Sequence, residues 1–199
     1  MTGAGAPLGQ DAAWVVLETP LDPARLAAFC GDLERLYRIN PFLEFASWEQ
    51  AAPGRFRAEI LNHSNGQRMV LAASATRISD LALRVDYQEG LKKRTRFEIQ
   101  PTPSGSRLTI TDEYGPTGAG AQNTGVDRSL HAWGVALKAY LERDRRWGWL
   151  PLYRPVMQRL WLPMKPVARR ITFLILVIGL ADILLIALGL AIYWIESAR

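Results

Sequence analysis

The sequence contains few of the residues that build metal centres and covalent cross-links. Its 199 residues include one cysteine, Cys30, and two histidines, His63 and His131. A single cysteine excludes an internal disulfide and fits a reducing compartment. So few sulfur and imidazole groups leave little for a zinc site, and we predict neither a metal nor a cofactor. Residues 1–10 lack the basic and apolar regions of a secretion signal, and we expect them to form a flexible N-terminus.

Net positive charge is confined to one stretch. Residues 142–170 carry eight basic and two acidic side chains, a net charge of +6, whereas the whole chain carries +5, so the remainder sums to −1. The chain is therefore not basic throughout, which argues against nucleic acid as the partner. We predict no nucleic-acid binding and assign the basic stretch to membrane lipid, because anionic headgroups attract basic side chains.

The longest apolar run is 171–195, which contains one charged residue, Asp182. A helix of these 25 residues is about 37 Å long, enough to cross a hydrocarbon core of about 30 Å. An aromatic pair near one end and an arginine pair at the other match the flanks of a membrane span. We predict a single-pass protein anchored through 171–195, with 196–199 as a short tail.

The basic stretch beside this run predicts the orientation of the anchor. Cytoplasmic flanks of membrane spans carry an excess of Lys and Arg, so we expect the N-terminal domain in the cytoplasm. Arginine outnumbers lysine twenty to four, a bias that favours a GC-rich bacterial genome. The predicted location is therefore a bacterial inner membrane.

Asp182 is the sharpest signal within the anchor. A carboxylate at mid-bilayer costs about 2.5–3.5 kcal/mol on insertion scales and rarely faces lipid. It belongs to a stripe of mostly small and polar residues with 3–4 spacing, which allow close helix packing: Thr172, Ile175, Gly179, Asp182, Ile186, Gly189 and Tyr193. We predict that this face contacts another transmembrane helix, from a second copy or another subunit. The alternative is a lone anchor with a protonated Asp182.

The first part of the chain predicts a strand followed by a helix. A short β-type run, 14–18, precedes Asp22, a good N-cap, and Pro23, which suits the first helical position. Apolar residues then recur at helical spacing until Pro41 ends the helix. Cys30 lies on this apolar face, which favours a buried core residue over a reactive thiol.

Residues 42–114 predict an antiparallel meander of six strands. Short runs of alternating apolar and polar residues are separated by turn signals such as Pro53-Gly54 and Asn65-Gly66. A sheet with one polar face needs an element to cover its other face. We expect that cover to be a helix that follows a glycine-rich loop at 115–125, is capped by Asp127 or Ser129 and has an apolar side formed by Leu130, Trp133, Leu137 and Leu141. The loop lacks the spacing of a phosphate-binding motif.

The chain has the order of a strand, a helix with a short second helix, about six antiparallel strands and a long C-terminal helix. This order resembles the START-like superfamily, the helix-grip fold of polyketide cyclases and lipid-transfer domains. The resemblance covers 11–149 and rests on the helix start at Asp22-Pro23 and on Arg38-Ile39-Asn40-Pro41 before the second strand. It implies an α+β fold, with an antiparallel sheet wrapped on a long C-terminal helix, which one transmembrane helix follows here. It also implies an apolar cavity for a hydrophobic small molecule such as a lipid, quinone, sterol or polyketide. Together with the strand alternation, it places these residues at the cavity: Phe56, Ala58, Ile60, Leu83, Val85, Tyr87, Phe97, Ile99, Leu108, Ile110, Asp112, Tyr114, Trp133 and Leu137.

Asp112 is the one acidic side chain in this set. Inward-facing, it could act as an acid, a base or an anchor for a ligand's polar group; if the strand ends before it, the carboxylate is solvated. His63 and His131 have no partner at a suitable spacing, and we assign no catalytic residue. We interpret the basic hairpin at 92–96 as a solvated turn, or as a contact for acidic lipid or a partner protein.

The segment 150–170 interleaves aromatic residues, basic residues and prolines. Tryptophan and arginine together beside a span favour a segment in the headgroup region, and the alternative is that the aromatics pack on the soluble domain. The predicted membrane-surface residues are Arg145, Arg146, Trp147, Trp149, Arg154, Arg159, Trp161, Lys165, Arg169 and Arg170.

Two functions from different classes follow. The first is a tail-anchored domain that binds or presents a hydrophobic ligand at the membrane surface. The second is an accessory subunit of a membrane complex, docked through the Asp182 face, with its cavity filled by side chains. Cyclase-type catalysis ranks third, because no acid–base pair can be assembled from the sequence.

Overall fold

The structure is a computed structural model that describes residues 12–115 and 123–197. The chain forms two compact units, Met1–Pro163 and Met164–Arg199. The predicted flexible N-terminus, most of the glycine-rich loop and the last residues of the tail lie outside the described residues.

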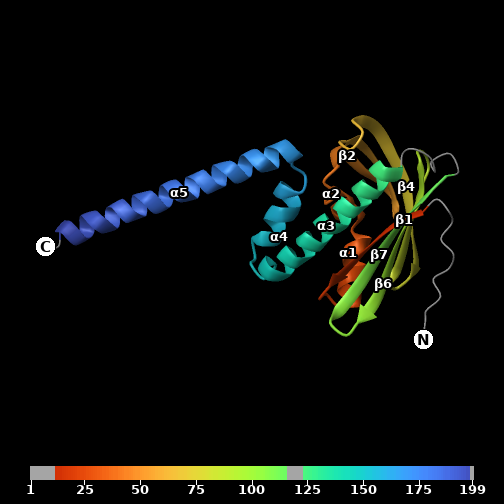
Figure 1. Cartoon of the computed structure of the whole chain (residues 1–199), viewed down its shortest axis with the longest axis horizontal. Helices are drawn as coiled ribbons and strands as arrows, with labels where there is room; N and C mark the ends of the chain where they lie inside the picture. The colour runs from red at the N-terminus through yellow and green to blue at the C-terminus, as the bar shows by residue number, and fades with distance from the viewer. Residues whose placement is uncertain (1–11, 116–122, 198–199) are drawn as a thin grey trace. The chain divides into compact units, whose positions relative to one another are not determined.

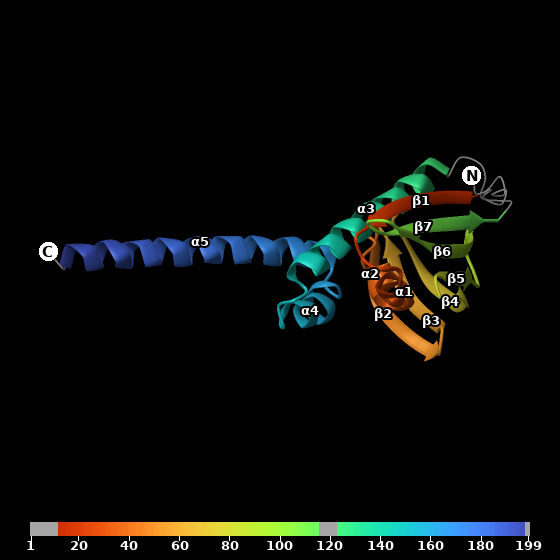
Figure 2. The ribbon, with the colours of Figure 1, turned by 90° about the horizontal axis from the view of Figure 1, so that it is seen from below.

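The first unit is built on one antiparallel sheet of seven strands. They are β1 (Ala12–Thr19), β2 (Leu43–Ala52), β3 (Arg55–Asn62), β4 (Gln67–Ser79), β5 (Ala82–Tyr87), β6 (Lys92–Thr102) and β7 (Gly105–Tyr114). Their spatial order is β1-β7-β6-β5-β4-β3-β2, so β2 to β7 form a meander and β1 joins at its end beside β7. Figure 2 shows the strands in this order around a curved sheet. The six strands predicted within 42–114 are thus confirmed.

The alternation in sequence becomes an alternation in burial. In β3 the buried residues are Phe56, Ala58 and Ile60, and their neighbours are exposed. In β6 the same period buries Thr95, Phe97 and Ile99. One face of the sheet therefore lies in the core and the other carries charges, as expected for an antiparallel sheet with one solvated face.

Two short helices, rather than one, follow β1. Helix α1 (Pro23–Gly31) begins at the predicted cap, where the Asp22 side chain accepts a hydrogen bond from the Arg25 backbone N–H at 2.9 Å. It ends at Asp32, which in turn caps α2 (Leu33–Arg38). The apolar periodicity runs through Asp32 without a visible break, so the single helix predicted from that spacing alone was too long. The short second helix in the element order of the resemblance is present as α2. The cap at Asp32 is the physical reason, because its side chain accepts from the Arg35 N–H.

Helix α3 (Asn123–Trp147) covers the apolar face of the sheet, together with α1 and α2 (Figure 1). Leu130, Trp133, Leu137 and Leu141 are all buried, as predicted. The helix begins at Asn123, ahead of the predicted caps at Asp127 and Ser129. Gly134 lies against β1, where an added Cβ would meet the Val15 side chain at 2.6 Å, so glycine permits the close approach of α3.

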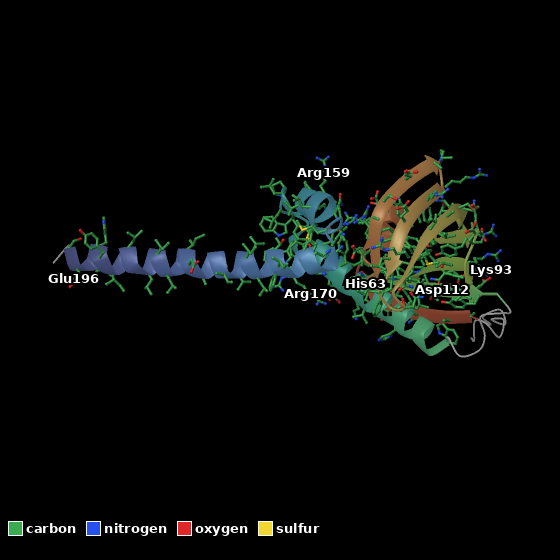
Figure 3. All side chains as sticks on the ribbon, turned by 90° about the horizontal axis from the view of Figure 1, so that it is seen from above. His63, Lys93, Asp112, Arg159, Arg170 and Glu196 are labelled. Atoms are coloured by element: carbon green, nitrogen blue, oxygen red, sulfur yellow. The ribbon has the colours of Figure 1, made fainter. Side chains whose placement is uncertain are left out.

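The chain then forms α4 (Tyr153–Val156), a π-helical turn η1 (Met157–Trp161) and, in the second unit, α5 (Pro166–Ser197). Residues 168–197 of α5 form one helix that is long and apolar enough to cross a membrane, and they contain the predicted span. Arg170 and Glu196 lie toward opposite ends of α5, so the side chains between them form an almost uncharged rod (Figure 3).

Candidate ligand-binding site

The interior between the sheet and α3 is filled by aromatic side chains. Trp133 of α3 lies between Tyr37 of α2 and Phe97 of β6, with ring centroids 5.3 and 5.9 Å away. Tyr37 also contacts Phe56, whose ring stacks on Trp48 at 4.6 Å. The Trp133 indole donates to the Leu36 carbonyl at 3.1 Å, which fixes its orientation. The interior is therefore a packed core with aromatic walls.

The residues predicted to line a cavity come together around this aromatic core. Leu83 and Tyr114 are half-buried and the other predicted residues are buried. Beside α1, part of the set lines a pocket of only about 20 Å³, which also contacts Cys30 and Arg77. That volume holds about one water molecule. A larger ligand could therefore enter this pocket only if it opens.

One region of the interior is polar. Asp112 of β7 is 1% exposed and accepts a hydrogen bond from the Thr95 hydroxyl at 2.5 Å and one from the Tyr114 hydroxyl at 3.3 Å. The Lys92 ammonium lies 2.5 Å from the same carboxylate. Thus Asp112 points inward, and the alternative of a solvated side chain is wrong. Figure 3 marks the position of Asp112 on the sheet.

A chain of hydroxyl groups leads to this carboxylate. The Tyr37 and Tyr87 hydroxyls share a short hydrogen bond, and Tyr87 is hydrogen-bonded to Thr95 at 2.8 Å. A hydroxyl has one proton, and Thr95 gives its own to Asp112, so Tyr87 donates to Thr95 and Tyr37 donates to Tyr87. We call Tyr37, Tyr87, Lys92, Thr95, Asp112 and Tyr114 the polar network. Its members come from α2, β5, β6 and β7.

Lys92 reaches the interior because of a β-bulge. The pairing of β6 with β7 shifts register between Lys92 and Arg94, so Lys92 lies opposite Tyr114. The ammonium is also 5.7 Å from the Tyr87 ring centroid and 6.0 Å from that of Trp133. The basic residues of the hairpin at 92–96 therefore lie on two different faces of the sheet. Arg94 and Arg96 lie on the outer face and pair with Glu113, while Lys92 turns inward.

The charges of this network are set by the neighbouring groups. Burial alone lowers the pKa of Lys92, but the Asp112 carboxylate and the nearby tyrosines outweigh it and raise that pKa, so Lys92 stays an ammonium. Burial raises the pKa of Tyr37, Tyr87 and Tyr114, so their hydroxyls remain neutral donors. The Lys92 side chain is about a third exposed, at 31%, and it is the most accessible charge in the network.

Several members of the network escaped the sequence analysis. Tyr37 counted only as an apolar helix residue, and Lys92 was assigned to a solvated turn. Thr95 has the same parity as Phe97 and Ile99, so extending the inward set by one step would have found it. No comparable signal marks Lys92, because a bulge is not visible in residue alternation.

The predicted membrane-surface residues are divided between the two units. In the first unit Arg145, Arg146, Trp147, Trp149, Arg154 and Arg159 are exposed, and Trp161 is half-buried. Leu162 is buried and Met157 packs against the core, so part of the 150–170 segment does dock on the soluble domain. In the second unit Lys165 and Arg170 are exposed, and Arg169 donates to the Met164 carbonyl at 2.9 Å.

The predicted contact residues of the anchor share one helix, α5. Asp182 and Gly189 are exposed there, and an added Cβ at Gly179 or Gly189 would meet no other atom within 4 Å. The described chain thus leaves this face open. A contact with another transmembrane helix stays a prediction.

No protein-family model and no curated protein matches this sequence. Solved structures do match the fold. A protein of Thermus thermophilus has a TM-score of 0.53 at 19% identity, with 67% of this chain and 98% of that chain covered. A START superfamily protein from Mycobacterium smegmatis has a TM-score of 0.53 at 16% identity over 67% of this chain and 98% of its own. A protein from Arthrobacter aurescens has a TM-score of 0.53 at 16% identity, covering 70% and 90% respectively.

These likenesses define the class of fold. The sheet order, the helices on one face and the similarity to a START superfamily structure show that the first unit has the START-like, helix-grip fold. The fold predicted from the order of elements in sequence is confirmed. At these identities the likeness speaks to the fold alone.

Proposed function

We propose that this chain is a membrane-anchored ligand-binding protein, whose START-like domain takes up a hydrophobic molecule with one polar group at the cytoplasmic membrane surface. The fold indicates a ligand-binding domain in general, and α5 is suited to anchor it. The observation that carries the proposal is the Lys92–Asp112 ion pair on the inner side of the sheet, where Asp112 is 1% exposed. A core needs no such pair for stability, because apolar side chains of similar volume often serve as well or better.

The accessible members of the network determine which ligand chemistry fits. Lys92 offers an ammonium and Tyr114 a hydroxyl that is half-buried and only weakly held, at 3.3 Å from Asp112. A carboxylate, phosphate, carbonyl or phenol oxygen on the ligand would accept hydrogen bonds from both. Asp112 and Thr95 lie deeper, and they hold the donors in position.

The apolar part of the ligand needs space that the closed interior does not provide among the described residues. Trp133 packs on Tyr37 and fills the region beside the network, so α3 or its side chains must move away from the sheet for binding. Anchoring at the bilayer supplies the ligand at high local concentration. We expect binding to be coupled to this opening.

The filled interior favours a second candidate, an accessory subunit of a membrane complex. In that case the domain is a rigid module and the Asp182 face of α5 provides the contact. Replacing Asp182 with Leu should then release the partner, or the second copy, in mild detergent. Replacing Leu184, which is 61% exposed on the same helix, with Ala is the matched control and should leave the assembly intact. Unchanged assembly of Asp182→Leu would exclude this contact.

Native mass spectrometry of the full-length protein, gently extracted from its own membrane, separates the two functions. Ligand binding predicts an additional stoichiometric mass of a few hundred daltons or more, released when the domain unfolds. Co-purifying polypeptides without such a molecule would overturn the ligand-binding proposal and support the accessory subunit.

A further inference from the structure

Segment 149–162 exposes apolar side chains on the face that points away from the core. Tyr153, Met157 and Leu162 turn toward the first unit, where Leu162 is 5% exposed. On the other side Leu152, Val156 and Leu160 recur every four residues and are 73%, 45% and 55% exposed. Residues spaced by four share one side of a helix, so these three form one apolar stripe over α4 and η1.

Tryptophan and arginine side chains border this stripe. Trp149 is 75% exposed, and the side chains of Arg154 and Arg159 are also exposed. In Figure 3 the Arg159 side chain projects outward from η1. We call the surface formed by Trp149, Leu152, Arg154, Val156, Arg159 and Leu160 the α4–η1 face. Exposed apolar residues mixed with tryptophan and arginine are typical of helices that lie in the headgroup region of a bilayer.

The α4–η1 face is held firmly on the domain. Asp144 near the end of α3 accepts from the Arg35 guanidinium of α2 at 3.5 Å and pairs with Arg154 of α4 at 3.6 Å. Arg35 also donates to the Tyr140 hydroxyl at 2.9 Å, and its guanidinium lies 5.0 Å from the Phe29 ring centroid. The Arg154–Asp144 pair ties the segment to α3, which Arg35 joins to α1 and α2, and the burial of Leu162 ties it to the core. The segment is thus part of the first unit rather than a loose linker.

The chain length to the anchor decides what can cover this face. Four residues lead from Leu162 to Pro166, where α5 begins, and a fully extended chain of that length spans at most about 14 Å. The five helical residues 166–170 before the apolar run add about 7.5 Å. If α5 crosses the membrane as proposed, the end of the segment is therefore held within about 22 Å of the start of the span. The net charge of +6 in 142–170 complements anionic lipid.

We infer that the α4–η1 face inserts into the headgroup layer of an anionic bilayer and holds the START-like domain in a fixed orientation on the membrane. This inference rests on the membrane anchorage in the proposed function and extends it. Because the segment is fastened to α2 and α3, it would orient the whole first unit, including the polar network. The domain would then act as a membrane-fixed module instead of one tethered by a flexible linker.

Spin labelling of the full-length protein tests this inference. Single labels are placed at Leu152→Cys and Leu160→Cys, at Leu184→Cys in α5, and at Val135→Cys, an exposed apolar position on α3. The native Cys30 is 2% exposed and should not be labelled. The protein is placed in nanodiscs of phosphatidylcholine with phosphatidylglycerol, and collisions with oxygen and with a water-soluble nickel chelate are measured.

The inference predicts that labels at 152 and 160 favour oxygen over nickel, as in a lipid environment, while the label at 135 remains aqueous. Nickel accessibility equal to that at 135 would overturn it. The label at 184 tests whether α5 lies in the membrane, independently of the α4–η1 face. An aqueous signal there would overturn the membrane anchorage itself. A lipid signal at 184 with aqueous labels at 152 and 160 would overturn only the α4–η1 contact.

The charge contribution is tested in the same nanodiscs with Arg159→Gln. Removing this charge should lower the equilibrium constant for insertion of the α4–η1 face about five-fold, because a basic residue near an anionic surface contributes about that factor. Arg57→Gln, an exposed arginine on β3, is the matched control and should have no effect. Equal loss in both variants, or none in either, would contradict a specific role for Arg159.

Discussion

The Lys92–Asp112 pair allows the most quantitative prediction. Replacing Lys92 with Met removes the ammonium that lies 2.5 Å from a carboxylate that is 1% exposed. Breaking a fully buried ion pair by removing one partner costs about 3–5 kcal/mol, since the other charge stays buried. The Lys92 side chain is about a third exposed, so water can partly replace the ammonium. We therefore expect a loss of about 2–3 kcal/mol in the free energy of unfolding.

The double variant Lys92→Met, Asp112→Asn is the internal control. In the wild type the Thr95 hydroxyl donates to one carboxylate oxygen of Asp112 at 2.5 Å and the Tyr114 hydroxyl to the other at 3.3 Å. The asparagine carbonyl can keep the bond from Thr95, while its amide NH2 can donate to the Tyr114 hydroxyl oxygen. With no buried charge left, it should lose about 1 kcal/mol or less, so it should be more stable than the single variant.

Urea unfolding of the full-length protein in nanodiscs, followed by near-UV circular dichroism, measures both variants. For a slope of about 1–3 kcal/mol per molar urea, the single variant's midpoint should fall by about 1 M or more. Equal midpoints for the single and double variants, both close to the wild type, would refute the pairing of Lys92 with Asp112 in the interior.

Two further predictions concern other titratable groups. Burial raises the pKa of the Cys30 thiol to about 12, so iodoacetamide at pH 8 should leave the native protein unmodified and alkylate it only after unfolding; rapid native labelling would contradict the buried position. Partial burial alone would raise the pKa of Asp86, but the hydrogen bond from Arg94 and the charges of Arg84 and Arg94 lower it overall. The pKa of Asp86 is about 4 in the unfolded chain and lower in the folded protein. Ionised Asp86 therefore stabilises the fold above pH 4, and this stabilisation is lost as the pH falls from about 4 through the folded-state pKa. The stability advantage of wild type over Asp86→Asn, measured by urea midpoints, should thus shrink between pH 7 and pH 3, and a constant difference would argue against the ion pairs of Asp86.

The fold could be predicted because its strands and helices follow local sequence patterns, namely alternating apolar residues and helix-capping residues. Alternation in 55–60 and 97–99 placed the buried face, and Asp22-Pro23 placed the first helix start. The break at Asp32 is not visible in the apolar spacing, which continues across it, while the start of α2 depends on one side-chain hydrogen bond, from the Arg35 backbone N–H to Asp32.

The candidate site was less accessible to sequence reasoning because it depends on distant contacts. Tyr37 meets Tyr87 across 50 positions, and Arg35 meets Asp144 across 109. Neither pair has a local signal. The inward turn of Lys92 follows from a one-residue shift between β6 and β7, which only the three-dimensional pairing reveals. Asp112 could be proposed as an inward carboxylate from strand parity, but its partner could not.

The filling of the interior follows from side-chain size together with register. Trp133, Phe97 and Tyr37 each appear as ordinary apolar positions in their own elements, and only the packing of α3 on the sheet brings their rings together. A resemblance to a fold that can enclose a cavity therefore does not determine how open this interior is. That question has to be answered by binding.

The most direct test of the ligand-binding account is the ligand occupancy of the double variant Lys92→Met, Asp112→Asn relative to wild type. Both proteins would be extracted from the same membrane and compared by native mass spectrometry, with the fraction carrying the additional small-molecule mass as the readout. The account predicts a well-occupied wild type and at least a ten-fold lower ratio of bound to free protein in the variant, which corresponds to about 1.4 kcal/mol. Equal occupancy in two folded proteins would contradict the assignment of the polar network as the ligand-binding site.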